Sequence, residues 1–338
     1  MNKKVYLIAE IGVNHNGSLK LAKKMITLAK KSGANAVKLQ TFKAENLVSP
    51  GTPKTEYQKK NTPSQQTHFD MIKSLELDQK QHIKIIKYCK NIKIDFISTP
   101  YSINDAKLLN KLGCKIFKTA SADIVDLEMH KYLSKINQKI IISTGMSSIK
   151  EITDCLEIYK RNKKKNIILL HCVSNYPCSY ESLNIKSIKL LKKKFKLNVG
   201  FSDHSVGNMA SILSLAFGSS VIEKHFTVNK LLKGPDQVTS VTPKEFKLLS
   251  NDLKLAIKIL GKEEKKCQPE EKTMRSIARK SLTLKRFIYK DEKIIKNDLT
   301  LMRPGYGLYY KNINKIIGKK ASKNLTKFHQ VKSSDLKC

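Results

Sequence analysis

Short apolar runs alternate with segments of helical periodicity through the first 260 or so residues of the chain. The runs predicted as strands lie at 5–10, 36–41, 94–100, 115–121, 139–146, 166–172, 198–204 and 220–225. Apolar residues at helical spacing follow each run, as in the predicted helix between Ser18 and Gly33. Continuous apolar strands are typical of a sheet covered on both faces. Eight such units favour a (β/α)₈ barrel, with an open doubly wound sheet as the alternative.

Two segments depart from this alternation. Residues 42–68 form a long polar stretch that predicts a functional or mobile loop. Residues 262–278 are charged and predict a linker between a barrel domain at 1–261 and a tail at 279–338. The tail has short strand-like runs and turn residues, so we expect a small β-rich domain that docking or dimerisation helps to stabilise.

Composition narrows the class of protein. The chain has 338 residues, 40% of them hydrophobic, which is enough for a large core. It has no apolar run long enough to span a membrane, and its N-terminal apolar stretch is too short for a signal peptide. Seven cysteines without a C-x-x-C pair fit a reducing compartment. We therefore expect a cytoplasmic protein that does not associate with membranes.

The net charge of +37 raises the hypothesis of nucleic-acid binding. Only five of the 65 basic residues are arginines, and the lysines are scattered along predicted helix faces. Sites that read bases favour arginine and aromatic residues, and tryptophan is absent. The pattern therefore argues against a nucleic-acid partner.

Polar side chains follow the apolar part of nearly every predicted strand, where a barrel enzyme builds its active site. They are Glu10, Lys38, Gln40, Thr99, Lys118, Ser121, Asp123, Ser143, Thr144, His171, Ser202, His204, Glu223 and His225. Burying an ammonium group without an anion is costly, so the two lysines predict an anionic substrate. Either lysine alone could instead form an ion pair with Glu10 or Asp123.

His204 and His225 stand at equivalent positions on consecutive predicted strands. A carboxylate accompanies each, Asp203 beside the first and Glu223 near the second. The pair predicts a divalent-metal site in which Asp203 or Glu223 orients the imidazoles, with positions left open for water and substrate. For either histidine alone, a core residue bonded to the neighbouring acid is the alternative. His171 has no adjacent acid and could belong to the core or support the site.

These strand ends resemble those of the sialic acid synthases, which condense phosphoenolpyruvate with an N-acetylmannosamine-type sugar. The matching motifs run through nearly the whole chain in family order: AEIGVNHNG (9–17), VKLQT (37–41), STPY (98–101), FKTASAD (117–123), STGM (143–146), LHCVSNYP (170–177), GFSDH (200–204), EKHFT (223–227), GPD (234–236) and RPGYG (303–307). The resemblance implies a (β/α)₈ TIM barrel followed by a small antifreeze-like (SAF) domain, joined in a domain-swapped homodimer.

The resemblance also implies a role for each matching position. His204 and His225 would hold Mn²⁺ or Mg²⁺. Phosphoenolpyruvate would contact Lys38, Thr99, Lys118, Ser121, Ser143, Ser174 and Ser202. The sugar would contact Gln40, Tyr176, Asp236 and, through the swapped tail, Arg303. Glu10 is the favoured acid/base or charge-stabilising residue, and Glu223 is the second candidate.

The implied product is a nine-carbon 2-keto sugar acid, with N-acetylneuraminate as the first expectation. Synthases of legionaminic and pseudaminic acids share these motifs and provide the alternative. Departures at Asp123, Ser174 and residues 237–240 lie on the substrate side, and the stretch 42–68 could discriminate between sugars. Two other hypotheses remain: a barrel enzyme that uses an aldose phosphate, and a basic carbohydrate- or nucleic-acid-binding protein with an inert barrel.

Overall fold

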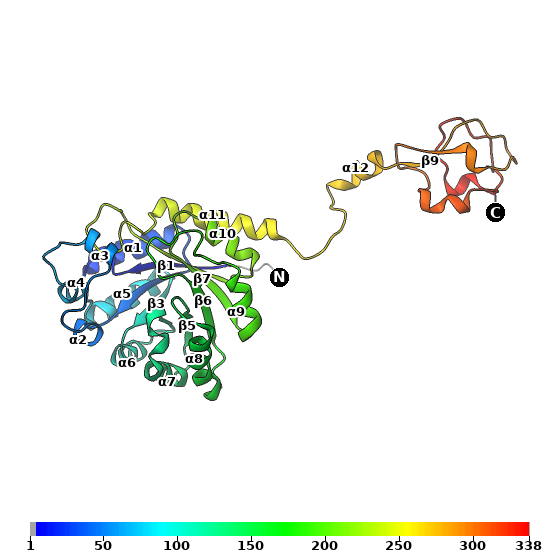
Figure 1. The fold of residues 1–338 in the computed structure, drawn as a ribbon. Helices are drawn as coiled ribbons and strands as arrows, with labels where there is room; N and C mark the ends of the chain where they lie inside the picture. The colour runs from blue at the N-terminus through cyan, green and yellow to red at the C-terminus, as the bar shows by residue number, and fades with distance from the viewer. Residues whose placement is uncertain (1–4, 338) are drawn as a thin grey trace. The chain divides into compact units, whose positions relative to one another are not determined.

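The computed structural model describes residues 5–337, and its first unit, Met1–Gly261, is a closed eight-stranded parallel barrel (Figure 1). The strands are β1 (Tyr6–Gly12), β2 (Ala36–Thr41), β3 (Asp95–Pro100), β4 (Ile116–Thr119), β5 (Lys139–Ser143), β6 (Ile167–Cys172), β7 (Asn198–Asp203) and β8 (Val221–His225). The barrel closes where β1 pairs with β8, with Ile8 opposite Glu223. The predicted barrel is therefore confirmed and the open sheet is excluded.

Amphipathic helices surround the strands. They are α1 (Leu19–Lys31), α5 (Gln79–Asn91), α6 (Ile103–Lys111), α7 (Leu127–Lys135), α8 (Ile149–Arg161), α9 (Ser187–Phe195), α10 (Met209–Ala216) and α11 (Pro243–Leu260). In α1, the Ser18 hydroxyl caps the first turn and the buried residues recur at helical spacing. Gly33 follows that helix at φ +99°, where a side chain would collide with Ser250.

The barrel interior contains an apolar layer beneath a polar one. Side chains two residues apart on a strand point to the same face, so each apolar residue supports the polar residue two positions later. The apolar layer is formed by Ile8, Ala36, Ile97, Ile116, Ile141, Leu170 and Val221. On β7 the corresponding position is Gly200, where a Cβ atom would lie 2.4 Å from the Val221 carbonyl oxygen. This packed floor keeps the polar layer at the C-terminal ends of the strands.

The stretch 42–68, predicted to lack structure, lies in a region that forms three short helices. These are α2 (Ala44–Leu47), α3 (Glu56–Asn61) and α4 (His68–Ser74). The loop prediction was wrong because α3 buries no residue and so shows no apolar periodicity. Hydrogen bonds fix the helix starts instead, such as the one that the Asp70 amide donates to Thr67 Oγ1.

The second unit spans Lys262–Cys338. It contains helix α12 (Glu271–Ala278), inside the segment predicted as a linker, and an antiparallel pair of strands, β9 (Ser281–Leu284) and β10 (Leu299–Met302). A small core of its own is formed by Leu282, Leu284, Ile288, Ile294, Leu299, Ile316, Ala321, Leu325 and Val331. The antifreeze-like assignment of this unit stays a prediction.

No helix within residues 5–337 combines the length and apolar character needed to cross a membrane.

Candidate active site

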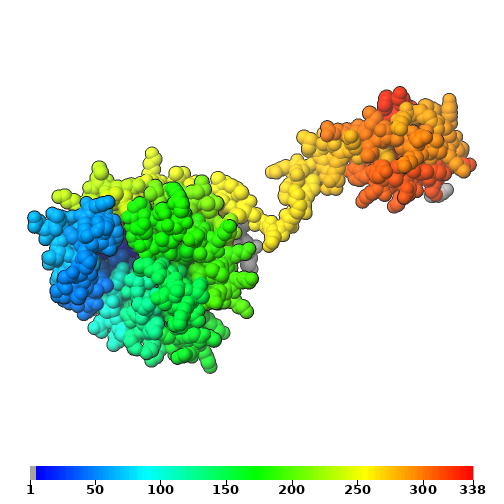
Figure 2. Space-filling view, viewed as in Figure 1, coloured from blue at the N-terminus to red at the C-terminus, as the bar shows by residue number. Residues whose placement is uncertain are grey.

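A cavity of about 840 Å³ opens at the C-terminal ends of the barrel strands. In Figure 2 the first unit is hollowed between its blue and green segments. Of the fifteen residues to which the resemblance gives a role, all but Arg303 line this cavity; the strand-end candidates Asp123, Thr144 and His171 do not line it. Arg303 follows β10 in the second unit, and its predicted role in a partner subunit stays a prediction.

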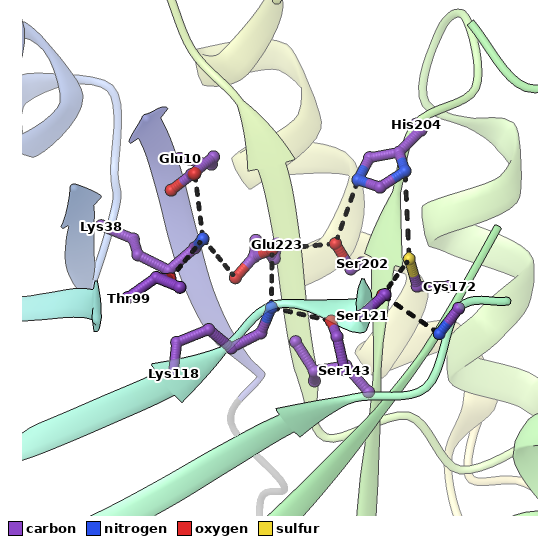
Figure 3. A network of polar contacts seen from close by, with 12 residues as sticks. Glu10, Lys38, Thr99, Lys118, Ser121, Ser143, Cys172, Ser202, His204 and Glu223 are labelled. Carbon is purple, nitrogen blue, oxygen red and sulfur yellow. Dashed lines mark hydrogen bonds and ion pairs between the residues drawn. The ribbon is translucent and has the colours of Figure 1, made fainter. Parts of the chain in front are cut away.

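Lys38 lies between two carboxylates in the cavity (Figure 3). Its Nζ is 2.9 Å from Glu10 Oε1 and 3.8 Å from Glu223 Oε2, and it donates a hydrogen bond to Thr99 Oγ1 at 3.3 Å. The ion pair with Glu10 that was considered for Lys38 alone is therefore present. Glu10 Oε2 is nevertheless buried without a hydrogen-bond partner, so this oxygen is available to accept a proton or a hydrogen bond from a substrate or water.

Lys118 approaches the carboxylate of Glu223 from β4. Its Nζ lies 3.5 Å from Glu223 Oε1 and donates to Ser143 Oγ at 2.7 Å. Its ion-pair partner is thus Glu223 and not the alternative Asp123. Ser202 Oγ donates to Glu223 Oε1 at 2.8 Å, so this carboxylate bridges β4, β7 and β8.

These surroundings shift the pKa values of the four charged groups in different directions. Burial raises the pKa of Glu10, and Lys38 offsets only part of this effect. Burial also acts to raise the pKa of Glu223, but Lys118 and Lys38 together lower it. Burial lowers the pKa of Lys118 despite Glu223, whereas Glu10 and Glu223 outweigh burial and raise the pKa of Lys38. A raised carboxyl pKa suits proton exchange near neutral pH, which supports Glu10 over Glu223 as the acid/base.

A cluster of small polar groups forms another side of the cavity. Cys172 Sγ lies 3.5 Å from Ser121 Oγ and 3.8 Å from Ser174 Oγ, and Ser121 Oγ accepts a hydrogen bond from the Gly145 amide at 3.1 Å. A Cβ atom at Gly145 would come within 2.4 to 3.0 Å of Ser174, Ser121 and Cys172. Glycine therefore keeps this corner open for small oxygen-rich groups.

Sequence reasoning singled out His171 and missed its neighbour Cys172. His171 bonds to the Leu183 carbonyl at 2.7 Å and stacks on Phe201, so it belongs to the core. Cys172 points into the cavity because adjacent residues of a strand face opposite sides. Burial acts to raise the pKa of its thiol, but His204 above all lowers that pKa to about 7. The alternation itself was the signal that could have identified Cys172.

His204 and His225 lie side by side, with ring centroids 5.5 Å apart. His204 Nδ1 lies 2.8 Å from the Val173 carbonyl oxygen, which leaves Nε2 facing Ser202. His225 Nδ1 is buried without a partner, and burial keeps the pKa of this imidazole well below its usual value. Burial also acts to lower the pKa of His204, but Cys172 and the Val173 carbonyl raise it, so a metal there would displace a proton from this imidazole. With both rings neutral, the two imidazoles fit a divalent metal. Within residues 5–337 no third His, Cys, Asp or Glu completes the set, so water and substrate would supply the other ligands.

The predicted orienting role of Asp203 was wrong. Asp203 accepts hydrogen bonds from Ser205 and Ser211 and forms a 2.9 Å ion pair with Lys224 on the outer side of the strands. Adjacent residues of an extended chain face opposite sides, so Asp203 points away from His204. The Val173 carbonyl oxygen orients the His204 imidazole instead.

Two of the predicted sugar contacts, Tyr176 and Asp236, lie on the histidine side of the cavity. Tyr176 packs on His204 with ring centroids 4.2 Å apart, and Tyr57 from α3 packs on Tyr176 at 5.4 Å. Asp236 is buried in the cavity wall, and burial raises its pKa to about 6. Gln40 also lines the cavity, at the end of β2. Tyr57 was missed by sequence reasoning because it belongs to the stretch predicted as a loop.

The motifs at these strand ends agree with a comparison to known families. A model of the NeuB family matches residues 25–265. The chain belongs to the NeuB family. The resemblance to the sialic acid synthases is thereby confirmed.

Named NeuB-family relatives extend over almost the whole chain. An N,N'-diacetyllegionaminic acid synthase of Campylobacter jejuni is 43% identical over 95% of this chain and 97% of its own length. A synthase of the same name from Legionella pneumophila is 41% identical over 95% of this chain and 91% of its own. The crystal structure of an N-acetylneuraminic acid synthetase of Leptospira borgpetersenii has a TM-score of 0.73 and 33% identity, covering 81% of this chain and 90% of that one.

Proposed function

We propose that this NeuB-family enzyme condenses phosphoenolpyruvate with an open-chain 2,4-diacetamido sugar to give a nine-carbon 2-keto sugar acid of the legionaminic type. The observation that carries the reaction is the buried pair Lys38 and Lys118, which face a large polar cavity from β2 and β4. The two relatives named N,N'-diacetyllegionaminic acid synthases support the choice of sugar. They favour it over N-acetylmannosamine, the acceptor first expected from the sequence.

The lysine side of the cavity is suited to phosphoenolpyruvate. Two ammonium groups already held in place lower the cost of bringing a multiply charged anion out of water. The hydroxyls of Thr99 and Ser143, each bonded to a lysine, can turn toward the phosphate and carboxylate oxygens. We assign Ser121, Ser174 and Ser202 to the same anion because they line the same cavity.

The chemistry forms one carbon–carbon bond, forms one carbon–oxygen bond to water and breaks the carbon–oxygen bond to phosphate. The methylene carbon of phosphoenolpyruvate attacks the sugar aldehyde, whose oxygen takes up a proton and becomes a hydroxyl. Positive charge develops at the carbon that bears the phosphate, where Glu10 can stabilise it and accept a proton from the water that adds there. Loss of inorganic phosphate leaves the 2-keto acid, so one water is consumed for each product.

His204 and His225 are the residues that would hold a divalent Mn²⁺ or Mg²⁺ ion. When bound, such an ion supplies a Lewis acid for the aldehyde oxygen. Tyr176 packs against His204 in the wall of the cavity. Gln40, Tyr176 and Asp236 are placed to contact the sugar.

Arg303 extends the proposal to the assembly. The second unit carries this arginine directly after β10, and a domain-swapped homodimer would bring it to the partner subunit's cavity. An arginine there would donate hydrogen bonds to an N-acyl oxygen of the sugar.

Acceptor-dependent release of phosphate tests the proposal. The full chain is incubated with phosphoenolpyruvate, Mn²⁺ and, in separate reactions, N-acetylmannosamine or 2,4-diacetamido sugars of different stereochemistry. We expect the highest kcat/KM with a 2,4-diacetamido sugar, and no release by the Lys38→Met variant. Absence of acceptor-dependent release from every sugar would refute the reaction, and a preference for N-acetylmannosamine would refute the choice of acceptor.

A further inference from the structure

A buried ion pair lies directly behind the two histidines of the proposed metal site. Asp203 precedes His204 and Lys224 precedes His225 in the sequence, and Lys224 Nζ lies 2.9 Å from Asp203 Oδ2. Adjacent residues of an extended chain face opposite sides, so the ion pair points away from the cavity that both imidazoles line. Any influence of the pair on the imidazoles therefore passes through the backbone.

Hydrogen bonds from the ion pair fix the backbone on both sides of His204. Asp203 Oδ1 accepts hydrogen bonds from the Ser205 amide at 2.9 Å and from the Ser205 hydroxyl at 2.6 Å. Lys224 Nζ donates to the Ser205 carbonyl oxygen at 2.6 Å, and Asp203 Oδ2 accepts from Ser211 Oγ on α10 at 2.5 Å. His204 thus lies between two residues that Lys224 contacts.

The ion pair also lies where the pairing of the two strands stops. The parallel register of β7 with β8 ends at Asp203 opposite Lys224, one residue before His204. His225 is held on its other side by β1, where it lies opposite Glu10. The contacts of Lys224 with Asp203 and Ser205 therefore extend the connection between β7 and β8 past the end of the backbone ladder, as far as His204.

The position of this pair in the barrel is unusual for charged residues. Asp203 and Lys224 are no more than 2% exposed, and a buried ion pair is often no more stabilising than apolar residues of similar volume. The other buried charged residues of the barrel strands all line the cavity; they are Glu10, Lys38, Lys118 and Glu223. Outward-facing residues elsewhere on the strands, such as Ile142 and Leu169, belong to the apolar core. Packing alone therefore does not account for an ion pair at this place.

We propose that Lys224 is a positioning residue for the metal. Through Asp203 and Ser205 it holds His204 at the separation from His225 at which both imidazoles can bind one ion. The inference rests on the proposed function, because it takes these two histidines to be the metal ligands. Two imidazoles bind one ion only if their nitrogens converge, and a displacement of about 1 Å makes such a site too loose. Phosphoenolpyruvate is assigned to the lysine side of the cavity, so its binding should depend much less on Lys224.

The affinity of the full chain for Mn²⁺, measured by electron paramagnetic resonance, tests this role. In Lys224→Met we expect Mn²⁺ to bind about 10- to 100-fold more weakly, the range for lost support of metal ligands. The affinity for phosphoenolpyruvate, measured by calorimetric titration without Mn²⁺, should stay at the wild-type level. Asp203→Asn/Lys224→Met should show the same loss of Mn²⁺ affinity, and it folds without the unpaired buried charge that the single variant leaves.

The matched control is Ile152→Ala on α8, a buried residue that does not line the cavity. Truncation of a buried isoleucine lowers the Tm, so this variant separates a loss of stability from a loss of metal affinity. We expect its affinity for Mn²⁺ to equal that of the wild type.

The outcomes separate this inference from the function on which it rests. A wild-type chain that binds no Mn²⁺ would overturn the metal assignment of the proposed function. If the wild type binds Mn²⁺, an equal affinity in folded Asp203→Asn/Lys224→Met would overturn the positioning role alone. Equal losses of Mn²⁺ and phosphoenolpyruvate affinity in the Lys224 variants, or weakened Mn²⁺ binding in Ile152→Ala, would also overturn it, because either result would indicate a general loss of structure.

Discussion

Lys118→Met and Lys38→Met should both abolish tight binding of phosphoenolpyruvate, but only the second should destabilise the protein. Burial lowers the pKa of Lys118, so its charge is held at a cost in the folded state. Methionine fills a similar volume, and Glu223 keeps Ser202 and Lys38 as partners. We therefore expect Lys118→Met to change the free energy of unfolding by less than about 1 kcal/mol.

Lys38 is in the opposite situation, because its carboxylate neighbours raise its pKa. Without it, Glu10 loses its 2.9 Å ion-pair partner while remaining buried. Breaking one side of a buried ion pair costs about 3–5 kcal/mol. For a barrel of this size we expect the Tm to fall by about 6–20 °C.

The affinity for phosphoenolpyruvate is measured by calorimetric titration, and the Tm by differential scanning fluorimetry. Loss of one buried charged contact costs about 2–5 kcal/mol of binding, so each variant should bind roughly 30- to 5,000-fold more weakly. Equal losses of Tm in the two variants would refute the electrostatic reasoning. Undiminished affinity in Lys118→Met would refute its assignment to the anion.

Three further predictions follow from single sites. His204→Ala and His225→Ala should each abolish Mn²⁺-dependent phosphate release and weaken Mn²⁺ binding measured by electron paramagnetic resonance; full activity in either variant would refute the metal assignment. Glu10→Gln should lower kcat about 10²- to 10⁴-fold with little change in affinity for phosphoenolpyruvate, as expected for a lost acid/base, and an unchanged kcat in steady-state assays would exclude that role. Asp335 is buried in the second unit, which acts to raise its pKa, but the hydrogen bonds from His329 and the Lys332 amide lower it. The stability from that lowered pKa is present above the unfolded value of about 4 and is lost as the pH falls through the folded value. Asp335→Asn should thus accelerate hydrogen exchange in the second unit relative to wild type at pH 7. A difference between variant and wild type in acid as large as that at pH 7 would contradict the explanation.

Much of the barrel and its site could be predicted because both follow local rules. Strands buried on both faces are continuous apolar runs, and the two-residue period of a strand places residues such as Ile141 and Ser143 on one face. The C-terminal ends of the strands converge in a closed barrel. Lys38 and Lys118 could therefore be predicted to lie in one site without knowledge of any side-chain contact.

Features that depend on packing between distant segments could not be predicted. Helix α3 buries no side chain, and its contacts with the distant residues Tyr176 and Pro235 show where it lies. Asp203 adjoins His204 in the sequence, yet its partner Lys224 lies on the next strand. The role of Arg303 depends on a second subunit, which the sequence of one chain does not place.

The most direct test of the central claim is the mass of the product formed from uniformly carbon-13-labelled phosphoenolpyruvate and a 2,4-diacetamido sugar. The account predicts a product with the summed mass of the sugar and labelled pyruvic acid, together with one inorganic phosphate for each product. Recovery of only pyruvate and phosphate, or of a product that retains the phosphate, would contradict it.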